Sequence, residues 1–399
     1  KSNKLANVCY DIRGPVLQQA KQMEDEGHKI IKLNIGNLAP FGFDSPEEIQ
    51  LDMIRNLPNA AGYSDSKGIF PARKAIMHYT QEKRIKGVTL EDIYIGNGAS
   101  ELIVMAMNAL LNAGDEVLVP APDYPLWTAA VSLSGGTPRH YLCDEQNGWM
   151  PDLDDIRAKI TPHTRAIVVI NPNNPTGYLD TRREMNQIRD LVKKYDLFLF
   201  SDEVYREFIY TGSPYISACH LEGIENNVVL IDSVSKRYSE CGIRIGALIT
   251  KNKEIRDAVM KFCQARLSPP LIVQIAAEAS LDAPEEYSRE TYDEYVERRK
   301  CLIDGLNRIP GVYSPIPMGA FYTVAKLPVD DSDKFCAWCL SDFEYEGQTV
   351  FMAPASGFYT TPGSGINEVR IAYVLKKEDL TRALFVLQKA LEVYPGRTE

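Results

Sequence analysis

The sequence predicts an α/β protein with a mostly parallel central sheet flanked by helices, together with a smaller, discontinuous α+β domain. Short apolar runs alternate with helical segments through the middle of the chain, which is typical of βαβ units around a buried sheet. Near the C-terminal end, a long charged helix and a few short strands replace that alternation. The chain has 399 residues, of which 45% are hydrophobic, so it is long enough to bury a sizeable core.

The individual elements follow from hydrophobic periodicity and from turn residues. Residues 16–27 show an amphipathic helical pattern that ends at Gly27, and a short strand at 30–35 leads into Gly36. In the middle of the chain, strands are predicted at 93–95, 116–119, 166–170, 197–200, 228–231 and 244–250, and helices at 100–111 and 181–195. Later elements are predicted helices at 287–306 and 377–394 and strands at 321–324 and 369–373.

These elements also predict the domain boundaries. Residues 1–15 are expected to form an extended N-terminal arm, and residues 46–280 a large domain that carries the central sheet. Residues 16–45 and 281–399 are expected to come together as the small domain.

Composition excludes several classes of protein. The net charge is −10 and no long run of Lys or Arg is present, which argues against binding to nucleic acid or to an anionic membrane. No apolar run approaches the roughly 20 residues needed to cross a bilayer. Eight dispersed cysteines without disulfide-framework spacing indicate a reducing compartment, so we expect a cytoplasmic protein. Cys336 and Cys339 form one C-x-x-C pair, but no second pair completes a metal site.

The loop after the strand at 228–231 carries a candidate reactive amine. Ser233 and Ser235 lie three residues and one residue before Lys236, and Arg244 follows eight residues after it. A lysine in such a loop is usually a surface residue. In this setting the amine, two hydroxyls and a guanidinium suit an anionic cofactor beside a covalently reactive lysine.

Two residues at the end of the preceding strand suggest what that cofactor is. Asp202 could cap a helix, or it could pair with a pyridinium nitrogen and keep it protonated, so that the ring acts as an electron sink. Tyr205 lies three residues later and could reach a ring hydroxyl, although core packing is the alternative.

Three further loops follow strand ends. Residues 96–101 lack the third glycine of a dinucleotide fingerprint. The free backbone N–H groups at the start of the helix that follows are suited to bind a phosphate, unless Ser100 simply caps that helix. Residues 171–177 are rich in Asn, Pro and Gly, and Asn174 either forms turns only or contacts a cofactor oxygen. Tyr124, in a proline-rich loop, either stacks on a planar cofactor or packs within the loop.

Arg370 lies among apolar residues in the predicted strand at 369–373. A buried arginine is costly unless it is paired. It therefore either binds a substrate carboxylate or forms an internal salt bridge.

Taken together, these strings resemble the fold-type-I, class I and II aminotransferases along essentially the whole chain. The resemblance is carried by residues 171–177, 201–205 and 233–236, with Arg244. Residues 8–15 and 121–127 are similar to bacterial glutamate–pyruvate (alanine) aminotransferases, whereas 353–373 are more similar to aspartate aminotransferases. The resemblance implies the aspartate aminotransferase-like fold of pyridoxal 5′-phosphate (PLP)-dependent transferases.

The resemblance also implies roles for the cofactor site. Lys236 would hold PLP as a Schiff base and then shuttle a proton between the substrate Cα and the cofactor C4′. Asp202 would pair with the pyridine nitrogen, and Asn174 and Tyr205 with the ring hydroxyl. Tyr124 would stack on the ring. The phosphate would be held by Ser233, Arg244 and the Ala99 and Ser100 amides.

Substrate and subunit contacts are implied in the same way. Arg370 would bind the substrate α-carboxylate, aided by the Gly36 backbone and by Asn174. Tyr63 matches a tyrosine that reaches the phosphate of the neighbouring subunit, which implies a homodimer with shared active sites. The chain departs from the family at 237–241, which are unusually polar, and at Ala247, where an aromatic residue is frequent; both departures bear on substrate choice.

The expected reaction is ping-pong transfer of an amino group from an L-amino acid to a 2-oxo acid, with aspartate or alanine as donor and 2-oxoglutarate as acceptor. A β-lyase or a decarboxylase on the same fold is the nearest alternative. A non-catalytic aminotransferase-like regulator would carry a DNA-binding domain, for which this chain offers no room. A nicotinamide oxidoreductase would leave Lys236, Asp202 and the loop at 171–177 without a role.

Overall fold

The computed structural model describes residues 2–8 and 14–398. The predicted N-terminal arm, 1–15, therefore lies partly outside the described residues, as does the string at 8–15. Within the arm, Asn3–Asn7 form a 3₁₀ helix, η1, so this part is helical where an extended segment was expected. The first α-helix, α1, spans Gly14–Asp25, and Gly27 follows it with φ +92°, a left-handed conformation that favours glycine.

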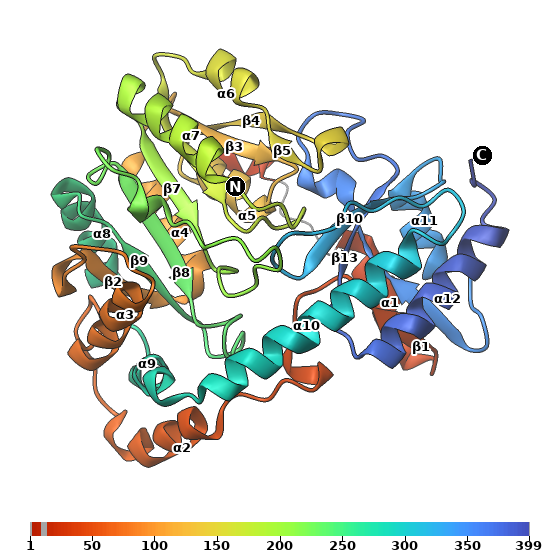
Figure 1. The fold of residues 1–399 in the computed structure, drawn as a ribbon, viewed down its shortest axis with the longest axis horizontal. Helices are drawn as coiled ribbons and strands as arrows, with labels where there is room; N and C mark the ends of the chain where they lie inside the picture. The colour runs from red at the N-terminus through yellow and green to blue at the C-terminus, as the bar shows by residue number, and fades with distance from the viewer. Residues whose placement is uncertain (1, 9–13, 399) are drawn as a thin grey trace.

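An eight-stranded sheet forms the centre of the larger part of the molecule (Figure 1). Its strands, in spatial order, are β2 (Ile93–Asn97), β9 (Ile245–Ile249), β8 (Val228–Ser233), β7 (Phe198–Asp202), β6 (Thr164–Ile170), β3 (Glu116–Ala121), β4 (Thr137–Asp144) and β5 (Met150–Pro151). The run from β8 to β4 is parallel, whereas β9 is antiparallel to both neighbours and β5 is antiparallel to β4. The predicted mostly parallel sheet is confirmed.

Helices cover both faces of this sheet, which explains the almost wholly apolar strands. On one face, Val168 packs in a cluster with residues of α4 (Gly98–Leu110), α5 (Pro125–Leu133) and α8 (Lys253–Ala265). On the other face, Ile167 packs with α6 (Leu153–Lys159) and α7 (Arg182–Tyr195). The remaining helices of this part are α2 (Glu47–Asn56), α3 (Phe70–Glu82) and α9 (Leu271–Ala279).

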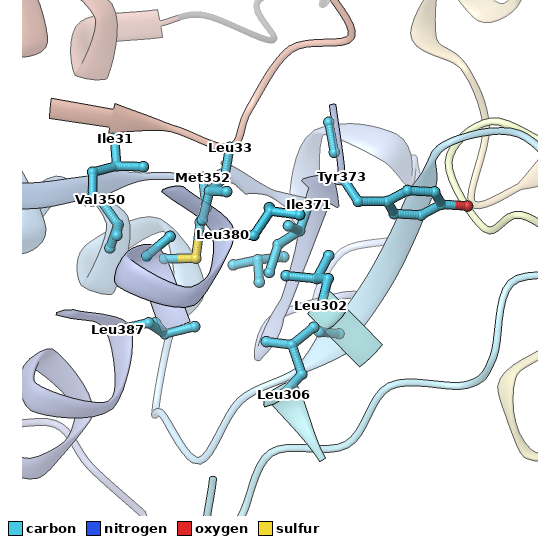
Figure 2. Packing of buried hydrophobic residues seen from close by; sticks show 14 of the residues in the cluster. Ile31, Leu33, Leu302, Leu306, Val350, Met352, Ile371, Tyr373, Leu380 and Leu387 are labelled. Atoms are coloured by element: carbon cyan, nitrogen blue, oxygen red, sulfur yellow. The ribbon is translucent and has the colours of Figure 1, made fainter. Parts of the chain in front are cut away.

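Two small sheets lie in the other part of the molecule. β1 (Lys29–Lys32) pairs in parallel with β11 (Gln348–Phe351), and β13 (Glu368–Ala372) pairs antiparallel with β10 (Tyr322–Lys326) and β12 (Ala353–Pro354). Helices α11 (Ser332–Cys339) and α12 (Lys377–Val393) pack beside them, and α10 (Glu285–Leu306) runs from the α2 and α9 side to α12 (Figure 1). In Figure 2, Leu302 and Leu306 of α10 lie in one cluster with Ile31 and Leu380.

The pairing of β1 with β11 joins segments more than 300 residues apart in the sequence. We propose on this basis that residues 16–45 and 281–399 form one small domain beside a large domain of residues 46–280. Within the described part of the chain, no helix is long and apolar enough to span a membrane.

Candidate active site

A cavity of about 700 Å³ opens at the carboxyl ends of β6, β7 and β8, where open α/β sheets place their ligands. Every predicted site residue except Tyr63 lines it. These residues are Gly36, Ala99, Ser100, Tyr124, Asn174, Asp202, Tyr205, Ser233, Lys236, Arg244 and Arg370. The structure therefore brings together side chains from both of the proposed domains.

Lys236 reaches the cavity from the loop that follows β8. Its Nζ atom donates a hydrogen bond to the Gly36 carbonyl over 3.1 Å and lies 3.4 Å from the Cys241 Sγ. The side chain is half-buried, so its amine is accessible to a ligand while its position is fixed by the Gly36 carbonyl. Cys241 was not among the predicted site residues.

Asp202 ends β7 and is buried at the floor of the cavity. The Trp127 indole N–H donates to its Oδ2 over 3.1 Å. Burial raises the pKa of Asp202 to about 6, while the Trp127 hydrogen bond acts in the opposite direction. The residues immediately after Asp202 form a turn and no helix, so the helix-cap interpretation of this residue is wrong.

The N-terminus of α4 forms a tight cradle with the strand β9. A Cβ atom on Gly98 would lie 2.3 Å from the Arg244 guanidinium, and one on Gly246 would lie 2.5 Å from the Ala99 backbone nitrogen. The residue preceding α4 is Asn97, which makes no side-chain capping hydrogen bond, so Ser100 lies inside the helix and does not cap it. Backbone N–H groups at a helix start, beside an arginine, suit a phosphate.

Ser233 completes the cradle from the end of β8. Its hydroxyl lies 2.9 Å from the Ile245 carbonyl and 2.8 Å from the Ser235 hydroxyl, and it accepts a hydrogen bond from the Ser235 N–H. These contacts fix the hydroxyl at the wall of the cavity, which both serines line.

Arg370 is 4% exposed, and no ion pair between described residues involves it. Its guanidinium donates to the Asn174 Oδ1 over 3.2 Å and to the Asn34 carbonyl over 2.6 Å. It also lies over the rings of Tyr322 and Phe358, with centroid distances of 4.6 and 4.9 Å. The described residues therefore offer Arg370 no internal salt bridge, and a buried cation with no carboxylate partner among them suits an anionic ligand.

Tyr205 pairs with a residue that the sequence did not indicate. Its hydroxyl donates to the Tyr322 hydroxyl over 3.3 Å, and burial together with Tyr322 raises the pKa of Tyr205. Tyr205 is therefore a neutral phenol with a proton to donate. A Cβ atom on Gly36 would lie 2.0 Å from the Tyr322 hydroxyl, so only glycine fits at position 36.

Tyr63 lies outside this cavity and is 83% exposed. Other large apolar side chains of the same region are also exposed; these are Ile54, Leu57, Phe70 and Leu267. Tyr124 and Leu126 both line the cavity. Among the described residues, no group of three or more His, Cys, Asp or Glu side chains is arranged to hold a metal ion.

Comparison with known proteins assigns the chain and its fold to a family. The family model described as aminotransferase class I and II matches residues 28–387. The chain belongs to the class I and II aminotransferases. It is 49% identical to the glutamate-pyruvate aminotransferase AlaA of Escherichia coli over 82% of both chains, and 43% identical to the alanine aminotransferase of Mycobacterium tuberculosis over 84% of this chain and 81% of that protein.

Solved aminotransferase structures share the whole fold. An aminotransferase from Escherichia coli superposes with a TM-score of 0.91 and 42% identity, over 99% of this chain and 98% of that one. The alanine aminotransferase of Pyrococcus furiosus gives a TM-score of 0.89 and 34% identity, over 98% of both chains. The protein is thus an aminotransferase with an aspartate aminotransferase-like fold. Neither a lyase, a decarboxylase nor a regulator is favoured by these comparisons.

Proposed function

We propose that this aminotransferase uses PLP to transfer the amino group between alanine and 2-oxoglutarate by a ping-pong mechanism. The observation that carries the proposal is the convergence of Lys236, Asp202, the α4 cradle and Arg370 on one cavity. The class I and II family depends on PLP in general, and the geometry of the described residues fits this cofactor.

The cradle fits the phosphate, since glycine at 98 and 246 leaves the α4 N-terminus open beside Arg244. Ser233 and the Ala99 and Ser100 amides would share that group. Asp202 would face the pyridine nitrogen, Tyr124 would stack on the ring, and Asn174 and Tyr205 would contact the ring hydroxyl. When bound, PLP supplies a protonated ring that accepts the electron pair left by deprotonation of the substrate Cα.

The protein's own groups orient the substrate and move its proton. Arg370, held by Asn174 and Asn34, binds the α-carboxylate and so presents the Cα–H bond to the cavity. Lys236 would hold the cofactor covalently and, once released by the substrate amine, its Nζ would take the Cα proton and deliver it to the cofactor C4′. The Gly36 carbonyl, 3.1 Å from Nζ, keeps that amine directed into the cavity.

Alanine is favoured over aspartate as the donor by the names of the relatives. Those with 49% and 43% identity are glutamate-pyruvate and alanine aminotransferases.

We further propose that the enzyme is a cytoplasmic homodimer in which Tyr63 reaches the phosphate of the partner subunit's site. The exposure of Tyr63, together with the exposed Ile54, Leu57, Phe70 and Leu267, supports an interface at this surface. The dispersed free cysteines support a reducing compartment.

The test is an absorbance titration of the PLP-loaded protein with single amino acids in the absence of any oxo acid. We expect the visible band of the lysine-bound cofactor to convert to that of the aminated cofactor, fastest with alanine or glutamate. Lys236→Ala should lose the band shift and all turnover. No cofactor band after addition of PLP, or near-normal turnover by Lys236→Ala, would overturn the proposal.

A further inference from the structure

A polar network, buried at Asp123 and reaching the surface at Thr360, connects the loop that carries Tyr124 to the segment that packs under Arg370. It consists of Asp123, Thr128, His140 and Thr360. Asp123 directly precedes Tyr124, Thr128 lies in α5, and His140 lies in β4. Thr360 follows the 3₁₀ helix η8 (Ala355–Phe358) and so belongs to the proposed small domain. The network therefore crosses from one proposed domain to the other.

The hydrogen bonds of this network form one consistent chain. The Thr128 hydroxyl donates to the Asp123 carboxylate. His140 Nε2 lies 2.9 Å from the Thr128 Oγ1 and 3.3 Å from the Asp123 Oδ2, so an Nε2–H donates to both. His140 Nδ1 forms a hydrogen bond with the Thr360 hydroxyl over 2.8 Å. Every donor in this chain meets an acceptor.

The network contacts both the loop that carries Tyr124 and the segment that packs against Arg370. The Asp123 N–H donates to the Phe358 carbonyl over 2.8 Å, which adds a backbone contact to the one made by His140. The Phe358 ring is 2% exposed and lies 4.9 Å from the Arg370 guanidinium. Any movement of the segment 358–360 would therefore change the support beneath Arg370, while Tyr124 would stay with the large sheet.

Burial also shows that the network is built into the fold. The Asp123 side chain is 2% exposed and that of His140 is 7% exposed. Burial raises the pKa of Asp123, and the contacts from His140 and Thr128 act against that rise. Burial of a carboxylate and an imidazole is costly unless they are paired, so their hydrogen bonds to each other and to the two threonines suit a positioning role.

We propose that His140 is a positioning residue that couples the cofactor loop to the substrate-binding arginine, by holding the segment 358–360 against Asp123 and thereby fixing Arg370. The proposal rests on the roles proposed above for Tyr124 and Arg370. His140 acts through other residues and does not line the cavity.

Thr360 offers the sharpest test, because it is exposed and its replacement leaves the core intact. Thr360→Val removes the hydroxyl at constant shape, Thr360→Ser keeps it, and Thr361→Val is the matched control at the exposed neighbouring threonine. Loss of one hydrogen bond should raise the KM for the amino acid about 3- to 10-fold, with kcat and the affinity for PLP unchanged. Thr360→Ser and Thr361→Val should match the parent.

Hydrogen exchange of the protein without PLP provides a second readout that does not depend on activity. We expect faster exchange in Thr360→Val for peptides that contain Asp123 and residues 358–360, and no change in Thr361→Val. A parent protein that neither binds PLP nor transaminates would contradict the proposed function alone. A Thr360→Val enzyme with parental KM and parental exchange, or a Thr361→Val enzyme with the same defect, would overturn the role of His140.

Discussion

Trp127→Phe should weaken PLP binding by removing the indole N–H that donates to Asp202. Both side chains are buried, and the Nε1–Oδ2 distance is 3.1 Å. A hydrogen bond to a charged group contributes about 1.5–3 kcal/mol, and about 1.4 kcal/mol corresponds to a factor of ten. The preference of Asp202 for its ionised form should therefore fall about 10- to 100-fold, and its pKa should rise above about 6.

The assay is a titration of the apoprotein with PLP across a range of pH, followed by the rate of the half-reaction with alanine. A protonated Asp202 cannot pair as an anion with the protonated ring nitrogen, so the parent should lose affinity as the pH falls through about 6. The variant should lose it at a higher pH. Phe200→Leu removes buried volume beside Trp127 but keeps the N–H, and it controls for lost packing. An affinity and a pH profile equal to those of the parent in Trp127→Phe would refute this reasoning.

Three further changes test the cradle, the arginine and a buried acid. Gly246→Ala would place a methyl group 2.5 Å from the Ala99 nitrogen, so PLP affinity, measured by absorbance, should fall about tenfold or more. Arg370→Gln should lower kcat/KM for the amino acid about 100-fold and leave the cofactor spectrum unchanged, as steady-state kinetics would show. Burial raises the pKa of Asp180 in the folded protein to about 8, whereas the pKa of this carboxyl in the unfolded chain is about 4. The free energy of unfolding should therefore fall as the pH rises from about 4 to about 8. Asp180→Asn should therefore match the parent in acid and exceed it in thermal stability, by a few kcal/mol, above about pH 8.

The regular elements of the large sheet were predictable because their signals are local. The helix expected at 181–195 is α7, Arg182–Tyr195, and its start is fixed by a capping box in which Thr181 and Glu184 exchange hydrogen bonds. β4 was not predicted. Its buried residues, Tyr141 and Cys143, lie only in its second half, and Pro138, Arg139 and His140 in its first half do not show the apolar pattern of a strand.

The loops of the site were predictable for a different reason. The carboxyl ends of neighbouring parallel strands meet at one edge of the sheet, so polar residues that follow those strands must come close together. This argument places Asn174, Asp202 and Lys236 in one cavity without any knowledge of the contacts. This argument does not identify Trp127 or Tyr322, because Trp127 lies on a helix and Tyr322 on a strand of another sheet. The hydrogen bonds of Trp127 with Asp202 and of Tyr322 with Tyr205 form only when these elements pack together.

The polar run after Lys236, unusual for the family, is explained by what lies beneath the loop. Arg237 is buried and its Nη2 lies 2.7 Å from the Asp232 carboxylate, which also pairs with Arg206. Burial alone would raise the pKa of Asp232, but the two guanidinium groups outweigh it and lower the pKa. Arg237 also lies 3.7 Å from the centroid of the Tyr79 ring in α3. Since Asp232 and Arg237 flank the segment that contains Ser233 and Lys236, their ion pair holds this loop closed at its base. Arg237 thus helps to fix the loop that carries Lys236. The loop sequence alone could not reveal this, because Arg206, which pairs with Asp232, and Tyr79, which contacts Arg237, come from distant elements.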